Sequence, residues 1–271
     1  MNVQRARRVI PSPYFRWKRA VDCCLASAAL AVALPMIGLL VLLVRLTSRG
    51  PGIYRQVRVG KDGRLFTMYK IRSMAADAEA SSGAVWARKR DPRVTRLGRV
   101  LRALHLDELP QLFNVLKGEM SLVGPRPERP EFVPILSARI PGYCDRLAVP
   151  PGITGLAQLN LPPDTDLNSV RRKLFLDLEY VAGGGPLFDL CLLAGTFFRA
   201  MKIPGRLVLP VFRLHREVPD CVCEAPAEDL ASLPLAPAAV RMGMSGQGDR
   251  CDDRTGMVGL VNSAVTASGR T

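Results

Sequence analysis

Residues 23–44 read CCLASAALAVALPMIGLLVLLV, a run of 22 apolar or small side chains that contains no charge. An α-helix of that length measures about 33 Å, which is close to the hydrocarbon thickness of a bilayer. A cleaved signal peptide ends its apolar core before an Ala-x-Ala site, whereas the triplets at 29–31 and 31–33 lie inside this run. The run therefore predicts a membrane helix, which we place at 20–47.

Basic residues flank this run on both sides. Those before it are Arg5, Arg7, Arg8, Arg16, Lys18 and Arg19, and those after it are Arg45, Arg49, Arg55 and Arg58. A helix that simply crosses a bilayer is expected to be strongly basic on its cytoplasmic side only. Pro35 lies near the middle of the run, where a proline kinks a helix. We therefore expect a re-entrant helix broken at Pro35, with both flanks among anionic headgroups. A simple span with an incidental proline is the alternative.

The positive charge of the chain is concentrated in its first half. Residues 1–130 carry 24 basic and 9 acidic side chains, whereas residues 131–271 carry 14 and 15. Such a basic half indicates an anionic partner, with phosphate as the expected chemistry. The sequence shows no helix-turn-helix pattern, zinc-finger spacing or aromatic-rich RNA-binding strand, which argues against nucleic acid. Phospholipid is the simpler partner, because the membrane segment lies within the basic half.

Residues 48–212 predict a mixed α/β unit. The pattern at 53–57 and 65–70 is that of two short strands, and the Asp-Gly pair within 60–63 suits a hairpin turn between them. Apolar spacing predicts helices at 106–116, 167–181 and 187–201. The last of these is too short to span a bilayer and is expected to be interfacial or buried in the core.

Residues 213–271 have a different character from the rest of the chain. They contain no Phe, Tyr or Trp and are rich in Ala, Pro, Gly and Ser. Such a segment cannot bury enough apolar surface to offset the entropy of ordering it. The sequence therefore divides into a basic N-terminal segment at 1–19, the membrane helix at 20–47, a folded domain at 48–212 and a disordered tail at 213–271.

Asp107 and Glu108 are adjacent carboxylates at the start of the helix expected at 106–116. The helix dipole lowers the pKa of an acid at this position. An ionised pair of this kind binds a divalent cation, or one member binds the cation while the other attacks an electrophile. The alternative is purely structural, an Asp N-cap followed by a first-turn Glu.

Four basic residues are candidates for phosphate contacts. Arg126 lies between two prolines, in a rigid loop that suits a fixed bidentate contact. Lys70 and Arg72 lie at the tip of the second expected strand, and Arg102 lies five residues before Asp107 in a helical spacing of arginines. Taken singly, Lys70, Arg72 and Arg102 fit a solvated surface better than a ligand contact.

Taken together, these residues resemble a known family. The motifs, in chain order, are Lys18-Arg19-x-x-Asp22, Arg49-Gly50-Pro51, Tyr54-Arg55-Gln56, Phe66-x-x-Tyr69-Lys70-x-Arg72-Ser73-Met74, Asp91-Pro92-Arg93-x-Thr95, Leu106-Asp107-Glu108-Leu109-Pro110-Gln111, Met120-Ser121-Leu122-Val123-Gly124-Pro125-Arg126-Pro127-Glu128 and Pro151-Gly152-Ile153-Thr154-Gly155-Leu156-Ala157-Gln158. The series is similar to that of the bacterial sugar transferases, the monotopic polyprenyl-phosphate phosphoglycosyltransferases that initiate capsule, exopolysaccharide and O-antigen assembly. The resemblance covers residues 16–203.

The resemblance implies transfer of a phosphosugar from a UDP-sugar to undecaprenyl phosphate, with release of UMP. Asp107 matches the nucleophile that forms a covalent phosphosugar intermediate. Glu108 matches its partner beside Mg²⁺, and the metal is expected on one or both of these carboxylates. Lys70, Arg102 and Arg126 match positions that meet phosphates in relatives, and Asp177 matches a further active-site acid.

The same resemblance implies a monotopic α/β enzyme of the bacterial inner membrane. Its catalytic domain at 48–212 is expected on the cytoplasmic face, with amphipathic helices at the interface, and a homodimer is left open. The alternative from another class is a non-catalytic basic adaptor on the membrane surface, in which Asp107 and Glu108 merely cap a helix.

The sequence departs from the family pattern at three places. Pro150 replaces a basic residue before Pro151, and residues 161–163 replace a Gly-Arg-Asn stretch. Both changes are expected to touch the sugar or nucleotide pocket, so the donor sugar is not identified. Leu34 replaces the serine that precedes the helix-breaking proline in some relatives, which leaves Pro35 to act alone.

Overall fold

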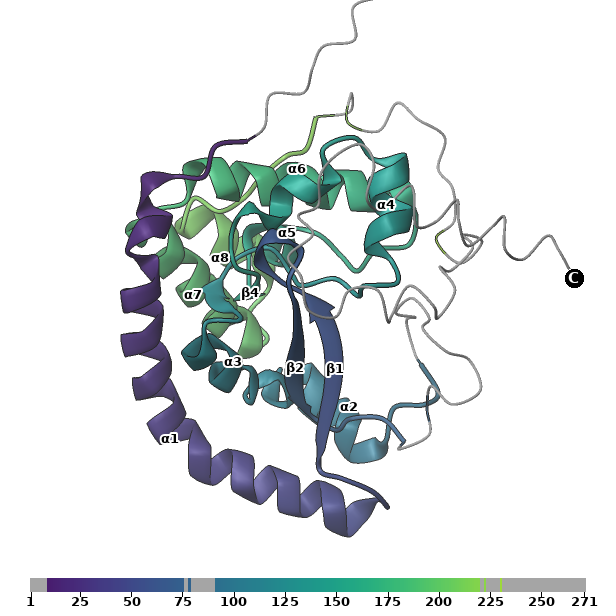
Figure 1. Ribbon diagram of the computed structural model, residues 1–271. Coiled ribbons are helices and arrows are strands. Elements are labelled where there is room, and N and C mark those ends of the chain that lie inside the picture. The colour runs from purple at the N-terminus through teal and green to yellow at the C-terminus, as the bar shows by residue number, and fades with distance from the viewer. Residues whose placement is uncertain (1–8, 76–77, 79–90, 220–221, 223–229, 231–271) are drawn as a thin grey trace, which may run out of the picture.

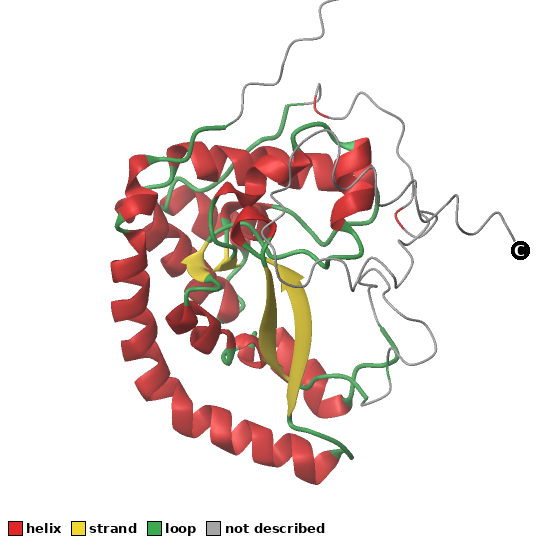
Figure 2. Cartoon of the chain, viewed as in Figure 1, coloured by secondary structure: helices red, strands yellow, loops and turns green. Residues whose placement is uncertain are grey.

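The computed structural model of the protein describes residues 9–75, 78, 91–219, 222 and 230. The fold is mixed α/β and mainly helical (Figure 1, Figure 2). The helices are α1 Lys18–Thr47, α2 Arg96–Ala103, α3 Gln111–Lys117, α4 Val133–Arg139, α5 Leu156–Asn160, α6 Leu167–Gly183, α7 Pro186–Ala200 and α8 Gly205–Val211. The strands are β1 Ile53–Val59, β2 Leu65–Ile71, β3 Ser121–Val123 and β4 Gly152–Thr154, and the 3₁₀ turns are η1 Pro13–Arg16, η2 Lys61–Gly63, η3 Leu106–Glu108 and η4 Tyr143–Ala148.

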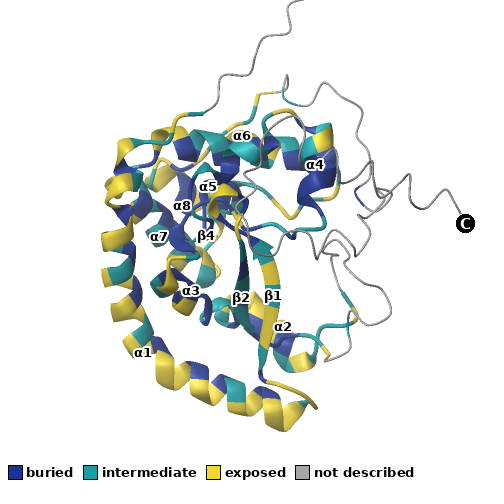
Figure 3. Cartoon of the chain, viewed as in Figure 1, coloured by how far each residue is buried: buried dark blue, intermediate teal, exposed yellow. Residues whose placement is uncertain are grey.

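Helix α1 covers the whole apolar run. Within the described part of the chain, it is the one helix long and apolar enough to cross a membrane. It contains Pro35 and bends along its length, following one side of the molecule and then passing below the β1–β2 hairpin (Figure 1). An internal proline produces such a bend. Much of α1 is exposed, as its yellow segments in Figure 3 show, and its exposed residues include the apolar Val32, Leu39 and Leu46.

Both ends of α1 are fixed to the rest of the protein. Near the N-terminal end, the buried Lys18 ammonium group forms ion pairs with Asp22, at 3.1 Å, and with Asp189 of α7. Just past the C-terminal end, the Arg72 guanidinium group donates to the Ser48 carbonyl oxygen at 2.8 Å and to its hydroxyl at 2.7 Å. The helix is therefore tied at both ends to one folded unit.

The main core lies between α1 and the helices and strands packed against it. Ala26 of α1, Val115 of α3, Leu176 of α6 and Leu192 of α7 are fully buried there. Leu214 is fully buried in the same core, so the packing extends slightly past residue 212. The prediction of a disordered tail at 213–271 falls mainly on residues outside the described ranges. Residues 1–8 of the basic segment predicted at 1–19 also lie outside them.

The predicted hairpin is confirmed. Strands β1 and β2 pair antiparallel from Ile53 opposite Ile71 to Val59 opposite Leu65. The turn between them contains Asp62 in the left-handed conformation, with φ 55°. The hairpin carries Lys70 at its end.

A parallel pair of short strands was not predicted from the sequence. Strand β3 pairs with β4, and each has three residues, which is too short for a recognisable pattern. Their backbones come so close that a Cβ atom on Gly152 would lie 2.0 Å from the Gly124 nitrogen. This contact fixes the start of the Pro125–Pro127 loop that carries Arg126.

The helices at 167–181 and 187–201 are confirmed as α6 and α7. The helix expected at 106–116 is confirmed at its end, where Gly118 adopts φ 85°, but not at its start. Residues 106–108 form the 3₁₀ turn η3, and α3 begins only after Pro110. Asp107 and Glu108 therefore lie in a separate turn rather than in the first turn of a helix.

Gly98 places α2 against the end of β2. A Cβ atom at this position would lie 1.9 Å from the Ser73 carbonyl oxygen, so Gly98→Ala must displace α2. We expect a loss of about 1–3 kcal/mol in unfolding free energy, measured by thermal unfolding of the purified protein. Gly183→Ala in α6 is the matched control, because its Cβ atom meets nothing within 4 Å. Equal melting temperatures for the two variants would contradict the prediction.

Candidate active site

The turn η3 presents two adjacent carboxylates in different environments. Asp107 is 6% exposed, and within the described residues its carboxylate has no hydrogen-bond or ion-pair partner. Glu108 accepts hydrogen bonds on one oxygen, Oε1, from the Lys70 ammonium group at 2.7 Å and from the Arg126 guanidinium group at 2.9 Å. One carboxylate is thus held by two cations, while its neighbour is left unpaired.

Three segments that are distant in sequence bring these groups together. Lys70 lies at the end of β2, Arg126 lies in the loop after β3, and Glu108 lies in η3 between α2 and α3. His105, with φ 56°, turns the chain from α2 into η3. The structure therefore assembles three of the predicted site residues around one carboxylate oxygen.

The two carboxylates have opposite pKa shifts. Burial is the largest influence on Asp107 and raises its pKa, with the Glu108 charge adding to the increase. Burial alone would also raise the pKa of Glu108, but Arg126 and Lys70 outweigh it and hold that pKa well below its ordinary value. The prediction that a helix dipole lowers both pKa values is wrong for Asp107, because η3 is a single 3₁₀ turn rather than the start of an α-helix and the side chain is buried.

Arg102 and Arg72 lie outside this set of direct contacts. Arg102 is exposed on α2 and donates from Nε to the Ser73 hydroxyl at 3.0 Å, and its charge lowers the pKa of Asp107. Arg72 is buried and turned towards Ser48 at the end of α1. Its Nε and Nη1 atoms are buried with no hydrogen-bond partner in the described structure.

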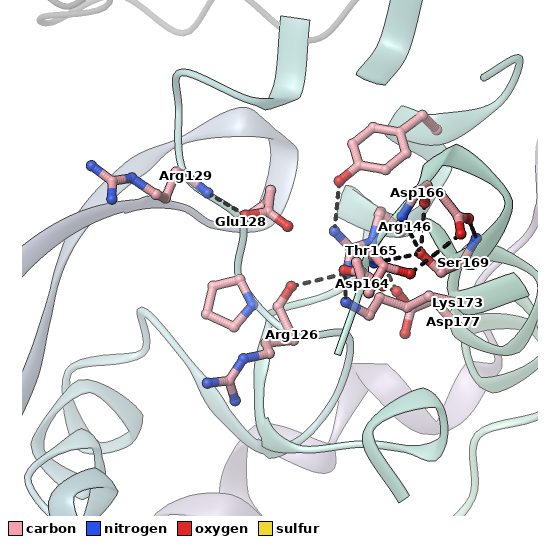
Figure 4. Close-up of polar contacts among 12 residues, drawn as sticks. Arg126, Glu128, Arg129, Arg146, Asp164, Thr165, Asp166, Ser169, Lys173 and Asp177 are labelled. Atoms are coloured by element: carbon pink, nitrogen blue, oxygen red, sulfur yellow. Dashed lines mark hydrogen bonds and ion pairs between the residues drawn. The ribbon is translucent and has the colours of Figure 1, made fainter. Parts of the chain in front are cut away.

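Asp177 lies in the middle of α6 and faces another buried residue, Arg146 of η4. The Asp177 Oδ2 atom accepts from Arg146 Nε at 2.9 Å and lies 2.7 Å from Arg146 Nη2 (Figure 4). The same guanidinium group donates to the backbone carbonyl of Arg126 at 2.9 Å. Asp177 is therefore linked to the site through Arg146 rather than through a direct contact with Asp107 or Glu108.

Arg146 is a residue that the sequence reasoning missed. Asp177 follows Leu174 by three residues and precedes Val181 by four, so it lies on the apolar face of its helix. A carboxylate on a buried face requires a cationic partner, which was a signal that such a partner exists. The spacing gives no indication of which arginine it is, because Arg146 is 31 residues away.

The carboxylates fit Mg²⁺ in one restricted way. No group of three or more Asp, Glu, His or Cys side chains that could hold a metal occurs among the described residues. Mg²⁺ commonly binds through one or two carboxylates together with substrate phosphates and waters. The unpaired Asp107 carboxylate and the second oxygen of Glu108 suit such a site, which would be completed by the substrate.

A family model and several known proteins match this chain in sequence. The family model described as "Bacterial sugar transferase" matches residues 13–203. A Bacillus subtilis (strain 168) protein named "Putative undecaprenyl-phosphate N-acetylgalactosaminyl 1-phosphate transferase" is 56% identical over 134 residues, which cover 49% of this chain and 74% of that protein.

Two longer matches cover about two thirds of this chain. The "UDP-N-acetylgalactosamine-undecaprenyl-phosphate N-acetylgalactosaminephosphotransferase" of Aeromonas hydrophila is 41% identical over 69% of this chain and 44% of its own length. The "UDP-glucose:undecaprenyl-phosphate glucose-1-phosphate transferase" of Escherichia coli (strain K12) is 41% identical over 67% of this chain and 39% of its own length. The chain thus spans less than half of these two relatives. Because the family model matches residues 13–203, which include α1, the carboxylate dyad of Asp107 and Glu108 and the cations around it, the chain belongs to the bacterial sugar transferase family.

Proposed function

We propose that this protein transfers a sugar phosphate from a UDP-sugar to undecaprenyl phosphate and releases UMP, as the first membrane step of polysaccharide synthesis. The observation that carries the proposal is the asymmetry of the dyad. Asp107 is buried and unpaired, whereas Glu108 is held by Lys70 and Arg126. The names of the relatives support the two substrates.

The first step is an attack by an Asp107 carboxylate oxygen on the β-phosphorus of the UDP-sugar. A bond forms between this oxygen and the β-phosphorus, and the bond from the β-phosphorus to the oxygen that bridges it to the α-phosphorus breaks. The bridging oxygen keeps the electron pair and leaves as part of UMP. The burial of Asp107 favours this role, because an ionised carboxylate without hydrogen bonds or an ion pair is a stronger nucleophile than a solvated one.

The second step reverses this displacement with the acceptor. A phosphate oxygen of undecaprenyl phosphate attacks the same phosphorus, and Asp107 leaves as the free carboxylate. Lys70, Arg126 and Arg102 supply fixed positive charge for the phosphate oxygens in both steps. A Mg²⁺ ion held by Asp107, Glu108 or both would supply further neutralisation of phosphate charge.

The test is a release assay with the full chain in membranes. Membranes containing the protein are incubated with Mg²⁺, undecaprenyl phosphate and a panel of UDP-sugars, and UMP is measured. Release with one donor supports the proposal and identifies the sugar, which the relatives leave open because their names give both N-acetylgalactosamine and glucose. Absence of UMP with every donor would favour the non-catalytic membrane adaptor.

We also propose that α7 and α8 lie on phospholipid on the same side of the membrane as both ends of α1. Exposed apolar side chains recur along these two helices, namely Leu187, Leu190, Phe197 and Met201 on and next to α7 and Leu207 and Val211 on α8. Arg199, Lys202 and Arg206 lie nearby in sequence and suit anionic headgroups. The ties from Lys18 to Asp189 and from Arg72 to Ser48 hold the two ends of α1 to this one unit.

Cysteine labelling of intact cells tests this topology. Gln4→Cys and Arg64→Cys, each in a chain without its native cysteines, are expected to resist a membrane-impermeant maleimide and to react after permeabilisation. Position 64 is exposed on the hairpin turn, so it reports on the catalytic unit. Labelling of position 4 but not position 64 in intact cells would show that α1 spans the bilayer.

A further inference from the structure

The loop that carries Arg126 is held through its carbonyl groups. Pro125 and Pro127 have no backbone N–H, so this segment has few donors of its own. The carbonyl oxygens of Pro125, Arg126, Pro127 and Glu128 accept hydrogen bonds from Gly152 N at 2.9 Å, Arg146 Nη2 at 2.9 Å, Arg58 Nη1 at 3.1 Å and Val59 N at 2.9 Å, respectively. Four consecutive carbonyls are thus fixed by different parts of the fold.

The bond to the Arg126 carbonyl sets the direction of the Arg126 side chain. Figure 4 shows the carbonyl oxygen pointing towards Arg146 and the guanidinium group pointing away from it. On its other side, that guanidinium group reaches Glu108 at 2.9 Å. The backbone of Arg126 has little freedom to rotate because it lies between two prolines. A fixed carbonyl group therefore also fixes the direction of its Cα–Cβ bond.

Arg146 is itself fixed on every side. It is 3% exposed, and all three of its guanidinium nitrogens are used: Nε and Nη2 on Asp177, Nη2 also on the Arg126 carbonyl, and Nη1 on the Tyr143 hydroxyl at 3.1 Å. Asp177 is also 3% exposed and supplies the opposite charge. The pair is therefore a buried, charge-balanced support under the Arg126 loop.

We infer that Arg146 is a positioning residue that holds Arg126 against Glu108, and that Asp177 acts through Arg146 rather than on the substrate. The inference rests on the proposed function, in which Arg126 meets the phosphates. It assigns Asp177 to the support of a phosphate-binding residue and brings in Arg146, which no motif had indicated.

The test replaces the pair as a unit. Removal of one partner alone would leave a buried unpaired charge and unfold the protein, whereas replacement of both by apolar residues of similar size commonly preserves stability. Arg146→Met combined with Asp177→Leu is therefore expected to melt near the wild-type temperature, while its kcat falls by about 10- to 100-fold because Arg126 is misplaced. A support that was merely structural would leave this double variant active.

Combination with Arg126→Met shows whether the pair acts through Arg126. If it does, adding Arg126→Met to the pair replacement lowers kcat by no more than about twofold below Arg126→Met alone, because the contact is already lost. If the combined variant instead showed the product of the two separate fold reductions in kcat, the inference would be overturned. If the pair replacement does not fold, Arg146→Lys takes its place, since it keeps the charge opposite Asp177 but lacks the planar fork. Wild-type kcat in Arg146→Lys would equally overturn it.

A control variant and amide hydrogen exchange test the inference further. Arg216→Met is the matched control, because it also removes an arginine paired with a carboxylate of α6, Glu179, without touching the Arg126 loop; its kcat is expected to be unchanged. Amide hydrogen exchange of the peptide 119–131 is expected to be faster in the pair replacement than in this control. This readout needs no turnover, so it judges the inference even where wild-type protein releases no UMP and the proposed function fails. Unchanged exchange would count against the inference.

Discussion

Asp107→Asn is expected to remove turnover, with kcat lower by at least about 10⁴-fold, as for the loss of other catalytic nucleophiles. A neutral amide neither attacks phosphorus nor leaves from it readily. The cations that we propose bind the phosphates are unchanged, so KM for the UDP-sugar should change far less than kcat. Near-normal turnover by a folded Asp107→Asn protein would show that Asp107 has only a structural role.

The melting temperature of Asp107→Asn tests the environment of this carboxylate independently of turnover. The Asp107 pKa is raised in the folded protein, so the folded state binds this proton more tightly than the unfolded state does. Stability is then lost as the pH rises through the folded pKa, because the ionised carboxylate is buried without a hydrogen-bond or ion-pair partner among the described residues. Asp107→Asn should therefore melt at the wild-type temperature or above it.

Isotope exchange separates the two half-reactions. Wild-type protein should transfer labelled UMP into UDP-sugar in the absence of any polyprenol, because the first half-reaction needs no acceptor. Asp107→Asn should not catalyse this exchange. A wild-type exchange that required undecaprenyl phosphate would contradict the covalent intermediate and favour direct transfer between the two substrates.

The elements that were predicted correctly are those whose signal is local. The hairpin turn contains Asp62 and Gly63, helix α3 ends at Gly118, and the apolar periodicity of α6 runs over 17 residues. Each of these signals lies within the element that it predicts. The β3–β4 pair has no such signal, since three residues cannot show a period, and its partners lie about 30 residues apart in sequence.

The grouping of Lys70, Glu108 and Arg126 was accessible only through the resemblance, because their mutual contacts depend on tertiary packing. The direction of the Asp107 pKa shift was predicted wrongly for a related reason. Sequence shows an acid at an apparent helix start, but Pro110 separates η3 from α3, and burial then decides the pKa. Sequence likewise shows Asp177 but not its partner Arg146, because a contact across 31 residues depends on tertiary packing.

Glu108→Gln makes the same change of charge one residue away and is expected to give a different result. Glutamine keeps the shape of the side chain but no longer attracts Lys70 and Arg126, whose ammonium and guanidinium groups meet at one carboxylate oxygen. With that anion removed, the two cations repel each other and lose their common anchor. We expect kcat to fall by about 10²- to 10³-fold, the usual cost of losing electrostatic positioning of a phosphate or oxyanion site. Measurable turnover should remain, because the nucleophile is intact.

The stability change should also be opposite to that of Asp107→Asn. The Glu108 pKa is lowered by its partners, so its ionised form stabilises the fold above the pKa of the unfolded chain, and a neutral Gln loses this contribution at pH 7. The loss is about 1–3 kcal/mol and comes mainly from Lys70, since the Arg126 side chain is 42% exposed and solvent screens that pair.

Thermal unfolding and UMP exchange of both variants, with a Mg²⁺ titration of turnover for Glu108→Gln and wild type, check this pair of predictions. Glu108→Gln should melt below wild type, retain slow UMP exchange and require more Mg²⁺ for half-maximal rate, because a carboxylate available to the metal has been lost. Asp107→Asn should melt no lower than wild type and catalyse no exchange. The two variants could instead lose turnover equally and change stability in the same direction. Separate roles for Asp107 as nucleophile and Glu108 as the anchor of Lys70 and Arg126 would then be wrong, and the two carboxylates would act as one symmetric metal site.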